Sequence, residues 1–189
     1  MPFARPRPRV IGNGGARGKG ANMNRGATEN GAATRPSLAP VTFAIEPDWI
    51  DYNGHLNMAR YPIMFDRAID GLMDRIGMPP IAGAGHALFA LEAQLRYLRE
   101  VHAEDRPIVT TDVLHFDAKR VHTFQRMRVG ERDVATCENL HLCMLRTGED
   151  AQAAPFPEAV LRSLSVLALP RSDWPAEVGV PIASRMVDP

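Results

Sequence analysis

The sequence is poor in cysteine, has no net charge and lacks long apolar runs. Its 189 residues include two cysteines, Cys137 and Cys143. If both lie on one strand, they stand about 20 Å apart at roughly 3.3 Å per residue, which is too far for a disulfide bond. The N-terminus also lacks the apolar core of a signal peptide. We therefore expect a reducing, cytoplasmic location.

Charge balance excludes two further classes of partner. Lys and Arg together number 22, as do Asp and Glu, and no apolar run is long enough to cross a membrane. We expect neither nucleic acid nor a membrane surface as a partner. The balance is uneven along the chain, because residues 1–40 hold seven basic residues and one acidic residue. The remainder is therefore net acidic.

Several catalytic motifs are also missing. No Gly-x-Ser-x-Gly elbow is present, so a serine hydrolase is not expected. Gly18-Lys19 fails the phosphate-loop pattern, because positions 13 and 20 are Asn and Gly. The histidines of the second half have no metal-ligand spacing, so no metal is predicted. They are His102, His115, His122 and His141.

Composition divides the chain into three parts. Residues 1–40 are rich in Gly, Arg, Pro and Asn and have few large apolar side chains, which predicts a basic, disordered tail. Residues 41–169 hold the periodic apolar segments and form the predicted domain. Residues 170–189 are predicted to be an extended tail.

One long helix is predicted in the first half of this domain. Asn57 is a plausible N-cap, although Pro62 places the first turn nearer Arg60. Gly77 and the prolines after it end the helix. Its apolar residues recur at three- and four-residue spacing and form one wide face. They are Tyr61, Met64, Phe65, Ala68, Ile69, Leu72, Met73 and Ile76.

Strand-like runs surround this helix in the sequence. A helix with so wide an apolar face needs a sheet wrapped around it, which predicts an α+β fold with about five antiparallel strands. A closing helix is expected at 157–169, with a proline at its start. The predicted strands are 41–45, 86–101, 107–116, 121–129 and 134–146.

The segment just before the long helix concentrates polar groups. Residues 48–57 read Asp-Trp-Ile-Asp-Tyr-Asn-Gly-His-Leu-Asn, with two carboxylates, one histidine and one glycine. A short loop held by a rigid helix is a common place for a site. A helix N-terminus also offers free N–H groups to an electrophile. This combination indicates acyl-transfer chemistry.

The same segment resembles a known family. Asp51-x-x-Gly54-His55-x-Asn57 followed by Tyr61 is similar to the signature of hotdog-fold acyl-CoA thioesterases of the 4-hydroxybenzoyl-CoA thioesterase type. The longer strings narrow the likeness to the betainyl-CoA thioesterase branch of carnitine breakdown. These strings are residues 49–55, 91–93, 97–101 and 117–122.

The resemblance implies a single hotdog fold and a catalytic role for Asp51. Thioester hydrolysis needs a carboxylate nucleophile or a base that activates water, and both remain open. Gly54 would allow close approach of the acyl carbonyl, and His55 would polarise it. The structural alternatives are a turn cap for Asp51, loop packing for His55 and a helix cap for Asn57. Glu92 would complete the site from a partner subunit or orient water, or would be a solvated strand residue.

Substrate contacts follow from the same resemblance. Tyr61 belongs to the motif and is assigned to the substrate. Trp49 and Tyr52 on the loop are the better candidates for a cage around a quaternary ammonium group, while core packing is favoured for the other two aromatic candidates, Phe89 and Tyr97. Lys119 and Arg120, at a predicted hairpin, are candidates for CoA phosphates, with solvation as the alternative.

The predicted function is hydrolysis of a short or polar acyl-CoA, with betainyl-CoA favoured. No cofactor is expected, since coenzyme A is part of the substrate. A homodimer or homotetramer is expected, because a curled sheet has open edges and an uncovered face. The alternatives are a non-catalytic acyl-CoA-binding protein and a hotdog enoyl-CoA hydratase or dehydratase.

Overall fold

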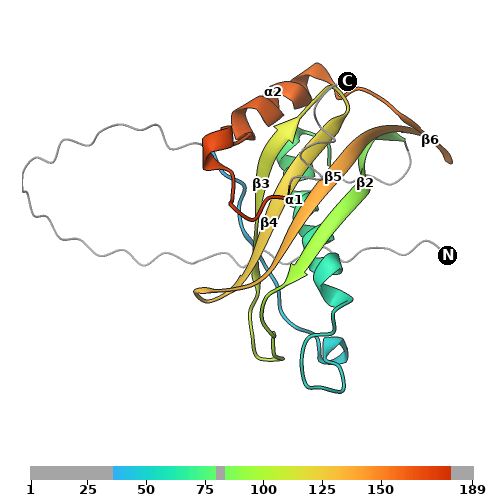
Figure 1. Ribbon diagram of the computed structural model, residues 1–189. Coiled ribbons are helices and arrows are strands. Elements are labelled where there is room, and N and C mark those ends of the chain that lie inside the picture. The colour runs from blue at the N-terminus through green and yellow to red at the C-terminus, as the bar shows by residue number, and fades with distance from the viewer. Residues whose placement is uncertain (1–35, 80–83, 180–189) are drawn as a thin grey trace, which may run out of the picture. The chain divides into compact units, whose positions relative to one another are not determined.

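The computed structural model describes residues 36–79 and 84–179 (Figure 1). Most of the predicted N-terminal tail and the end of the C-terminal tail lie outside these residues. Two α-helices, six strands and two short 3-10 helices make up the described chain. In order they are β1 (Val41–Thr42), η1 (Pro47–Trp49), α1 (Arg60–Ile76), β2 (Gly85–Tyr97), β3 (Ile108–Phe116), β4 (Arg120–Val129), β5 (Arg132–Thr147), β6 (Asp150–Ala153), α2 (Glu158–Leu167) and η2 (Arg171–Asp173).

The strands form one antiparallel sheet that curls around α1. Its order is β1-β3-β4-β5-β2, and β6 pairs with the end of β5. In Figure 1, α1 lies behind the sheet, and the segment after α2 crosses in front of it. The predicted α+β class and hotdog arrangement are confirmed. Strand β6 was not predicted; it takes the place of β4 beside β5 beyond Leu142.

Helix α1 runs over the predicted residues. Its whole apolar face is buried, and Gly77 ends it in the left-handed conformation with φ 83°. The predicted N-cap is wrong, because the cap position is Ala59 and no side chain caps the helix. Asn57 lies before the helix, where its Oδ1 accepts the Ala59 N–H at 2.9 Å.

Two apolar clusters fill the space between α1 and the sheet. The first joins the start of α1 to β4, β5 and the loop before the helix, through residues such as Trp49, Phe65 and Met127. The second joins the end of α1 to α2, through Leu72 and Leu164. Burial of these side chains at the start and at the end of α1 therefore fixes the helix against the sheet.

Strand β2 departs from the predicted alternation. Its register with β5 shifts between Ala90 and Glu92, so Leu91 is an extra residue in a β-bulge. Phe89 pairs with Leu142 and Glu92 with Leu140, two residues apart on β5. The alternating sequence of residues 86–101 predicts Phe89 on one face with Ala93 and Leu95. That prediction is wrong, because the bulge places Phe89 on the face of Glu92.

The same strand is an open edge of the sheet. Among the described residues, β2 pairs with β5 alone. Phe89, Leu91 and Tyr97 on it are 41%, 53% and 46% exposed. A long edge with large apolar side chains is a surface that native proteins usually cover. Neither described α-helix has the length and apolar character needed to cross a membrane.

Candidate functional site

The signature loop, residues 49–57, is a small hairpin at the entrance to α1. Ile50 and Leu56 form an isolated antiparallel bridge. The Asp51 N–H donates to the His55 carbonyl at 2.9 Å, and the Gly54 N–H donates to the Asp51 carbonyl at 3.0 Å. Gly54 has φ 80°, a left-handed conformation in which a β-carbon is strained. The glycine therefore closes the turn.

Asp51 lies at the first position of this turn and is half-buried. Its Oδ1 accepts the Asn53 N–H at 2.8 Å, which is an Asx turn. The structural role that the sequence left open for Asp51 is therefore present. The second oxygen takes no hydrogen bond from the described residues. One carboxylate oxygen therefore holds the side chain in place, and the other is uncommitted.

His55 is the residue of the signature loop that contacts the turn after β2. The Leu56 N–H donates to the Val101 carbonyl at 2.7 Å, which anchors the loop beside the fully buried Val101. The His55 ring meets the His102 ring edge-on, with centroids 5.0 Å apart. The prediction of no metal took His102 to lie apart from other ligand residues, but the fold places it beside His55.

The first turn of α1 is open to the loop. No side chain caps it. The Tyr97 hydroxyl donates to the Met58 carbonyl at 3.2 Å and fixes the residues just before the helix to the end of β2. Tyr61 meets Tyr97 edge-on at 5.2 Å, and burial, followed by the charge of Tyr97, raises the pKa of Tyr61 to about 12. Tyr61 is thus a neutral, buried phenol beneath the loop.

The structure does not bring the predicted aromatic cage together within one chain. Trp49 is 4% exposed and belongs to the core. The guanidinium carbons of Arg60 and Arg67 lie 5.5 and 5.6 Å from its ring centroid, so cations of the protein itself already occupy this ring. Tyr52, by contrast, is 97% exposed at the tip of the loop.

Glu92 is also remote from Asp51 within one chain. It lies five residues before Tyr97, whose hydroxyl contacts the loop, which is roughly 16 Å along the strand. Its cross-strand partner is Leu140, which follows Asn139 on β5 and therefore points to the opposite face of the sheet. Asn139 faces α1. Glu92 therefore points to the sheet face opposite α1, and the structure gives it no part in the loop's geometry.

The two predicted phosphate ligands differ in availability. Arg120 is held by Asp117, with Nε 2.6 Å from Oδ2. Burial raises the pKa of Asp117, but hydrogen bonds from Lys119 and Arg120 outweigh it and hold that pKa below its usual range. Lys119 is exposed at the turn. Of the two cations, Lys119 is the one free to approach a phosphate.

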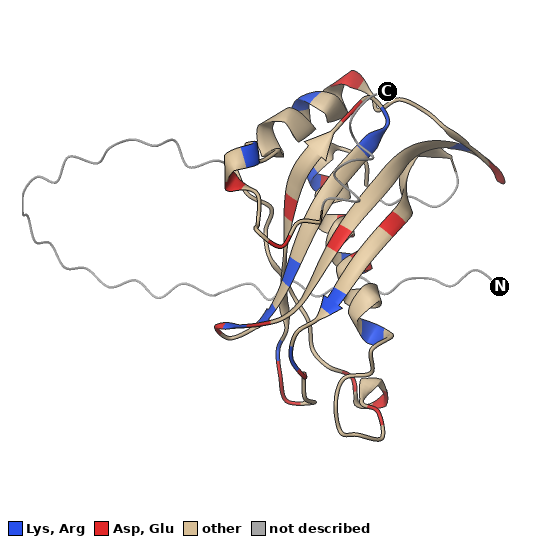
Figure 2. Ribbon diagram, in the orientation of Figure 1, with Lys and Arg blue, Asp and Glu red and all other residues tan. Residues whose placement is uncertain are grey.

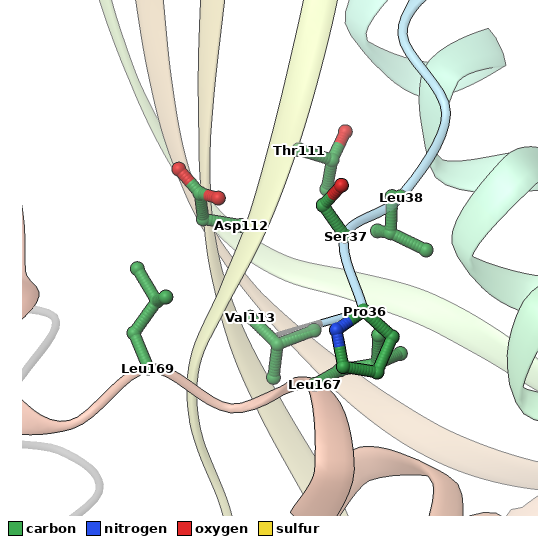
Figure 3. Close-up of a pocket in the computed structure, with 8 residues that line it drawn as sticks. All are labelled: Pro36, Ser37, Leu38, Thr111, Asp112, Val113, Leu167 and Leu169. Carbon is green, nitrogen blue, oxygen red and sulfur yellow. The ribbon is translucent and has the colours of Figure 1, made fainter. Parts of the chain in front are cut away.

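A pocket of about 180 Å³ lies elsewhere on the molecule (Figure 3). It is formed around β3, with Leu38 and Thr111 on one side of the strand and Asp112 and Leu169 on the other. It shares no residue with the signature loop, and ligand pockets for drug-sized molecules are larger. Burial raises the pKa of Asp112 there. We assign no substrate to this pocket.

Sequence reasoning overlooked a buried polar group on β4 and β5. His122 and Glu138, 0% and 2% exposed, face each other across the strands with Nε2 2.8 Å from Oε1. The Gly179 N–H donates to the other Glu138 oxygen at 2.6 Å, and the Trp174 ring covers His122 at 5.5 Å. The C-terminal segment, residues 170–179, therefore closes this pair from solvent. In the sequence, the His122–Glu138 pair is indicated only by polar residues on strands that are otherwise apolar.

The face of the sheet toward α1 holds a second polar group. Gln125 donates to the Phe65 carbonyl of α1 at 2.9 Å and to Thr111 Oγ1 at 3.1 Å. Asn139 donates to Gln125 Oε1 at 3.0 Å. These buried amides tie the middle of α1 to the sheet and do not reach the loop.

Comparison with known proteins adds independent information. The model of the Thioesterase-like superfamily matches residues 45–164, which include the signature loop and all of the strands except β1. A betainyl-CoA thioesterase of Pseudomonas aeruginosa is 34% identical over 136 residues, covering 71% of this chain and 86% of that protein.

Two further relatives agree with this match. An L-carnitine dehydrogenase/betainyl-CoA thioesterase of Ruegeria pomeroyi is 34% identical over 70% of this chain, which spans 27% of that longer protein. The crystal structure of a Pseudomonas putida protein assigned to the thioesterases is 36% identical, with a TM-score of 0.60. The matched region covers 70% of this chain and 85% of the Pseudomonas putida chain.

Proposed function

The chain belongs to the thioesterase-like superfamily and is a thioester hydrolase, and from that premise we propose that it hydrolyses betainyl-CoA or a similarly short, polar acyl-CoA at Asp51. The support for betainyl-CoA is the 34% identity to a betainyl-CoA thioesterase over most of both chains. The observation that carries the role of Asp51 is its geometry, with one carboxylate oxygen fixed in the turn and the other uncommitted.

Asp51 acts as a nucleophile or as a general base. As nucleophile, Oδ2 attacks the thioester carbon, the carbon–sulfur bond breaks, and water then hydrolyses the mixed anhydride. As base, Oδ2 takes a proton from the water that attacks the same carbon. In both cases the CoA thiolate leaves and is protonated. The Asx turn serves both, because it holds the carboxylate in one orientation.

The negative charge on the carbonyl oxygen is stabilised by donors beside Asp51. The first turn of α1 offers the Tyr61 N–H and the positive end of the helix dipole, because the Arg60 N–H already donates to the Asn57 carbonyl and Pro62 has no N–H. His55 lies in the same hairpin, one residue after Gly54. We assign Gly54 to the close approach of the substrate, and Asn57 to the orientation of the helix entrance through its bond to Ala59.

A second copy of the chain completes this site. The Asp51 loop is exposed at Tyr52, and the edge strand β2 carries Phe89 and Leu91 uncovered. Two-fold pairing of β2 with β2 would cover this edge and set one chain's strand beside the other chain's loop. Glu92 on β2 is then a candidate for contact with the partner's site. A homodimer or homotetramer is therefore part of this proposal.

The test is a comparison of two matched substrates. Betainyl-CoA and 3,3-dimethylbutanoyl-CoA have the same acyl shape, and they differ in a cationic nitrogen against a neutral carbon. Thiol release measured with a disulfide dye should show a higher kcat/KM for betainyl-CoA. Equal kcat/KM values for the two substrates would show that the cationic charge does not contribute to specificity. No thiol release from any acyl-CoA of a panel, together with tight binding of the ester, would instead show a binding protein.

A further inference from the structure

We propose that His55, Glu100 and His102 form a binding site for a divalent transition metal, of the zinc, cobalt or nickel class. The ligand atoms of these three side chains all lie within 4.8 Å of one another. His55 comes from the signature loop, and the other two come from the turn after β2. Of the three, only His55 also lies in the hairpin of the proposed hydrolysis, and the proposed metal has no part in that reaction.

The donor set determines which metals fit. Two imidazole nitrogens and one carboxylate oxygen are ligands that zinc and its neighbours in the first transition row prefer. Magnesium and calcium favour oxygen ligands alone, so they are not expected here. Three protein ligands also leave one tetrahedral position for water or another ligand.

The backbone holds the two segments in place for such a site. The Leu56 N–H donates to the Val101 carbonyl at 2.7 Å, so the residues next to His55 and His102 are bonded to each other. The His102 N–H donates to Asp105 Oδ2 at 2.8 Å, which fixes the turn on the other side. Both histidines are half-buried and already in ring contact at 5.0 Å.

A small adjustment closes the site around a metal. Ligand atoms of a tetrahedral zinc site lie about 3.3 Å apart, given bonds of about 2.0–2.1 Å. The largest separation, up to 4.8 Å, must therefore shrink by as much as about 1.5 Å. Glu100 is exposed, so its side chain can rotate toward the imidazoles without disturbing the core. The metal would then fasten the signature loop to the turn after β2.

The experiment measures metal binding directly, without reference to catalysis. The full chain is stripped with a chelator, freed of it, and titrated with Zn²⁺ by calorimetry and with Co²⁺ by visible absorption. The expected result is one metal per chain and a cobalt spectrum of low coordination number. A rise in unfolding temperature with Zn²⁺ is expected as well, because the metal binds the folded state.

Two variants and one control locate the site. His102→Ala and Glu100→Gln should each weaken Zn²⁺ binding by at least about tenfold, while His115→Ala, at an exposed histidine on β3, should bind as the wild type does. Glu100 is exposed, so E100Q is expected to fold even if H102A does not.

The proposal is overturned if the wild type shows no saturable binding. Unchanged affinity in H102A would place the metal elsewhere, and unchanged affinity in E100Q would remove the carboxylate from the site; both contradict it. Thiol release is measured separately in the presence of chelator. Hydrolysis that persists there leaves the proposed function intact whatever the metal result.

Discussion

Two neighbourhoods of this fold combine a carboxylate with histidine, and they differ in access. Asp51 and His55 are half-buried in a hairpin at the entrance to α1. Glu138 and His122 are fully buried on the sheet beneath the C-terminal segment. The same residue types thus occupy one place that is partly open to solvent and one that is closed to it. Solvent access and an uncommitted carboxylate oxygen, more than residue type, distinguish the neighbourhood that we propose to be catalytic.

The largest difference should appear between two amide substitutions. Asp51→Asn removes the nucleophile or base while keeping the Asx turn acceptor, so kcat should fall about 100- to 10,000-fold with little change in unfolding. Glu138→Gln should leave kcat close to that of the wild type. Thiol-release kinetics and urea unfolding of both variants check this. Hydrolysis at the wild-type rate in D51N would remove Asp51 from the mechanism.

Sequence reasoning predicted the first neighbourhood because its interactions are local. The turn of residues 51–55 closes within five residues, and the face of α1 follows from its helical period. His122 and Glu138 are 16 residues apart and meet only through strand register. The bulge at Leu91 and the contact of Gly179 with Glu138 also depend on pairing between distant segments. A single sequence does not display these distances.

The sheet contains another histidine whose burial should appear as a pH dependence. His141 is 5% exposed, and burial lowers its pKa to about 4 from 6.5. The folded chain keeps the imidazole neutral, while the unfolded chain takes up a proton below pH 6.5. Stability is therefore lost as pH falls, by roughly 2 kcal/mol at pH 5 and roughly 3 kcal/mol at pH 4, from this group alone.

Urea unfolding between pH 7.5 and pH 4 measures this loss. His141→Phe should flatten the dependence by that amount, and His115→Ala, at an exposed position, should not. A flattened curve separates His141 from the carboxylates, which also titrate in acid. If H141F keeps the full slope, the proton is taken up elsewhere.

A smaller effect is expected from breaking the buried pair itself. Glu138→Ala leaves His122 Nε2 and the Gly179 N–H without their acceptor, which should lower the free energy of unfolding by about 1–3 kcal/mol. Burial lowers the pKa of His122 despite the hydrogen bond that its ring makes to Glu138, so the imidazole is neutral at pH 7. Glu138→Gln keeps an acceptor and should recover part of the loss. Equal stability of the alanine and glutamine variants would contradict this account.

Substitution of Tyr52 tests the proposed recognition of a cation by the neighbourhood of Asp51. Its ring is 97% exposed at the loop tip, whereas the Trp49 ring is buried under Arg60 and Arg67. A cation–π contact with betainyl would contribute about 0.5–2 kcal/mol. Tyr52→Ala should therefore raise KM for betainyl-CoA several-fold and leave 3,3-dimethylbutanoyl-CoA unchanged. The same loss on both substrates would assign the ring to packing instead.

The smallest expected effect concerns the nucleotide end of the substrate. Lys119 is exposed, while Arg120 is held by Asp117, so of these two cations Lys119 is the one that can approach a CoA phosphate. An exposed ion pair contributes about 0.2–1 kcal/mol, so Lys119→Ala should raise KM by a factor of about two to five, and less at high salt.

An N-acetylcysteamine thioester of the same acyl group provides the control for Lys119, because it carries the thioester without any phosphate. K119A should hydrolyse this short substrate as the wild type does. A loss on both substrates would mean that the turn of residues 117–120 supports the fold, since Asp117 accepts the N–H groups of Lys119 and Arg120. An effect confined to the CoA ester would extend the accessible region from the signature loop to this hairpin.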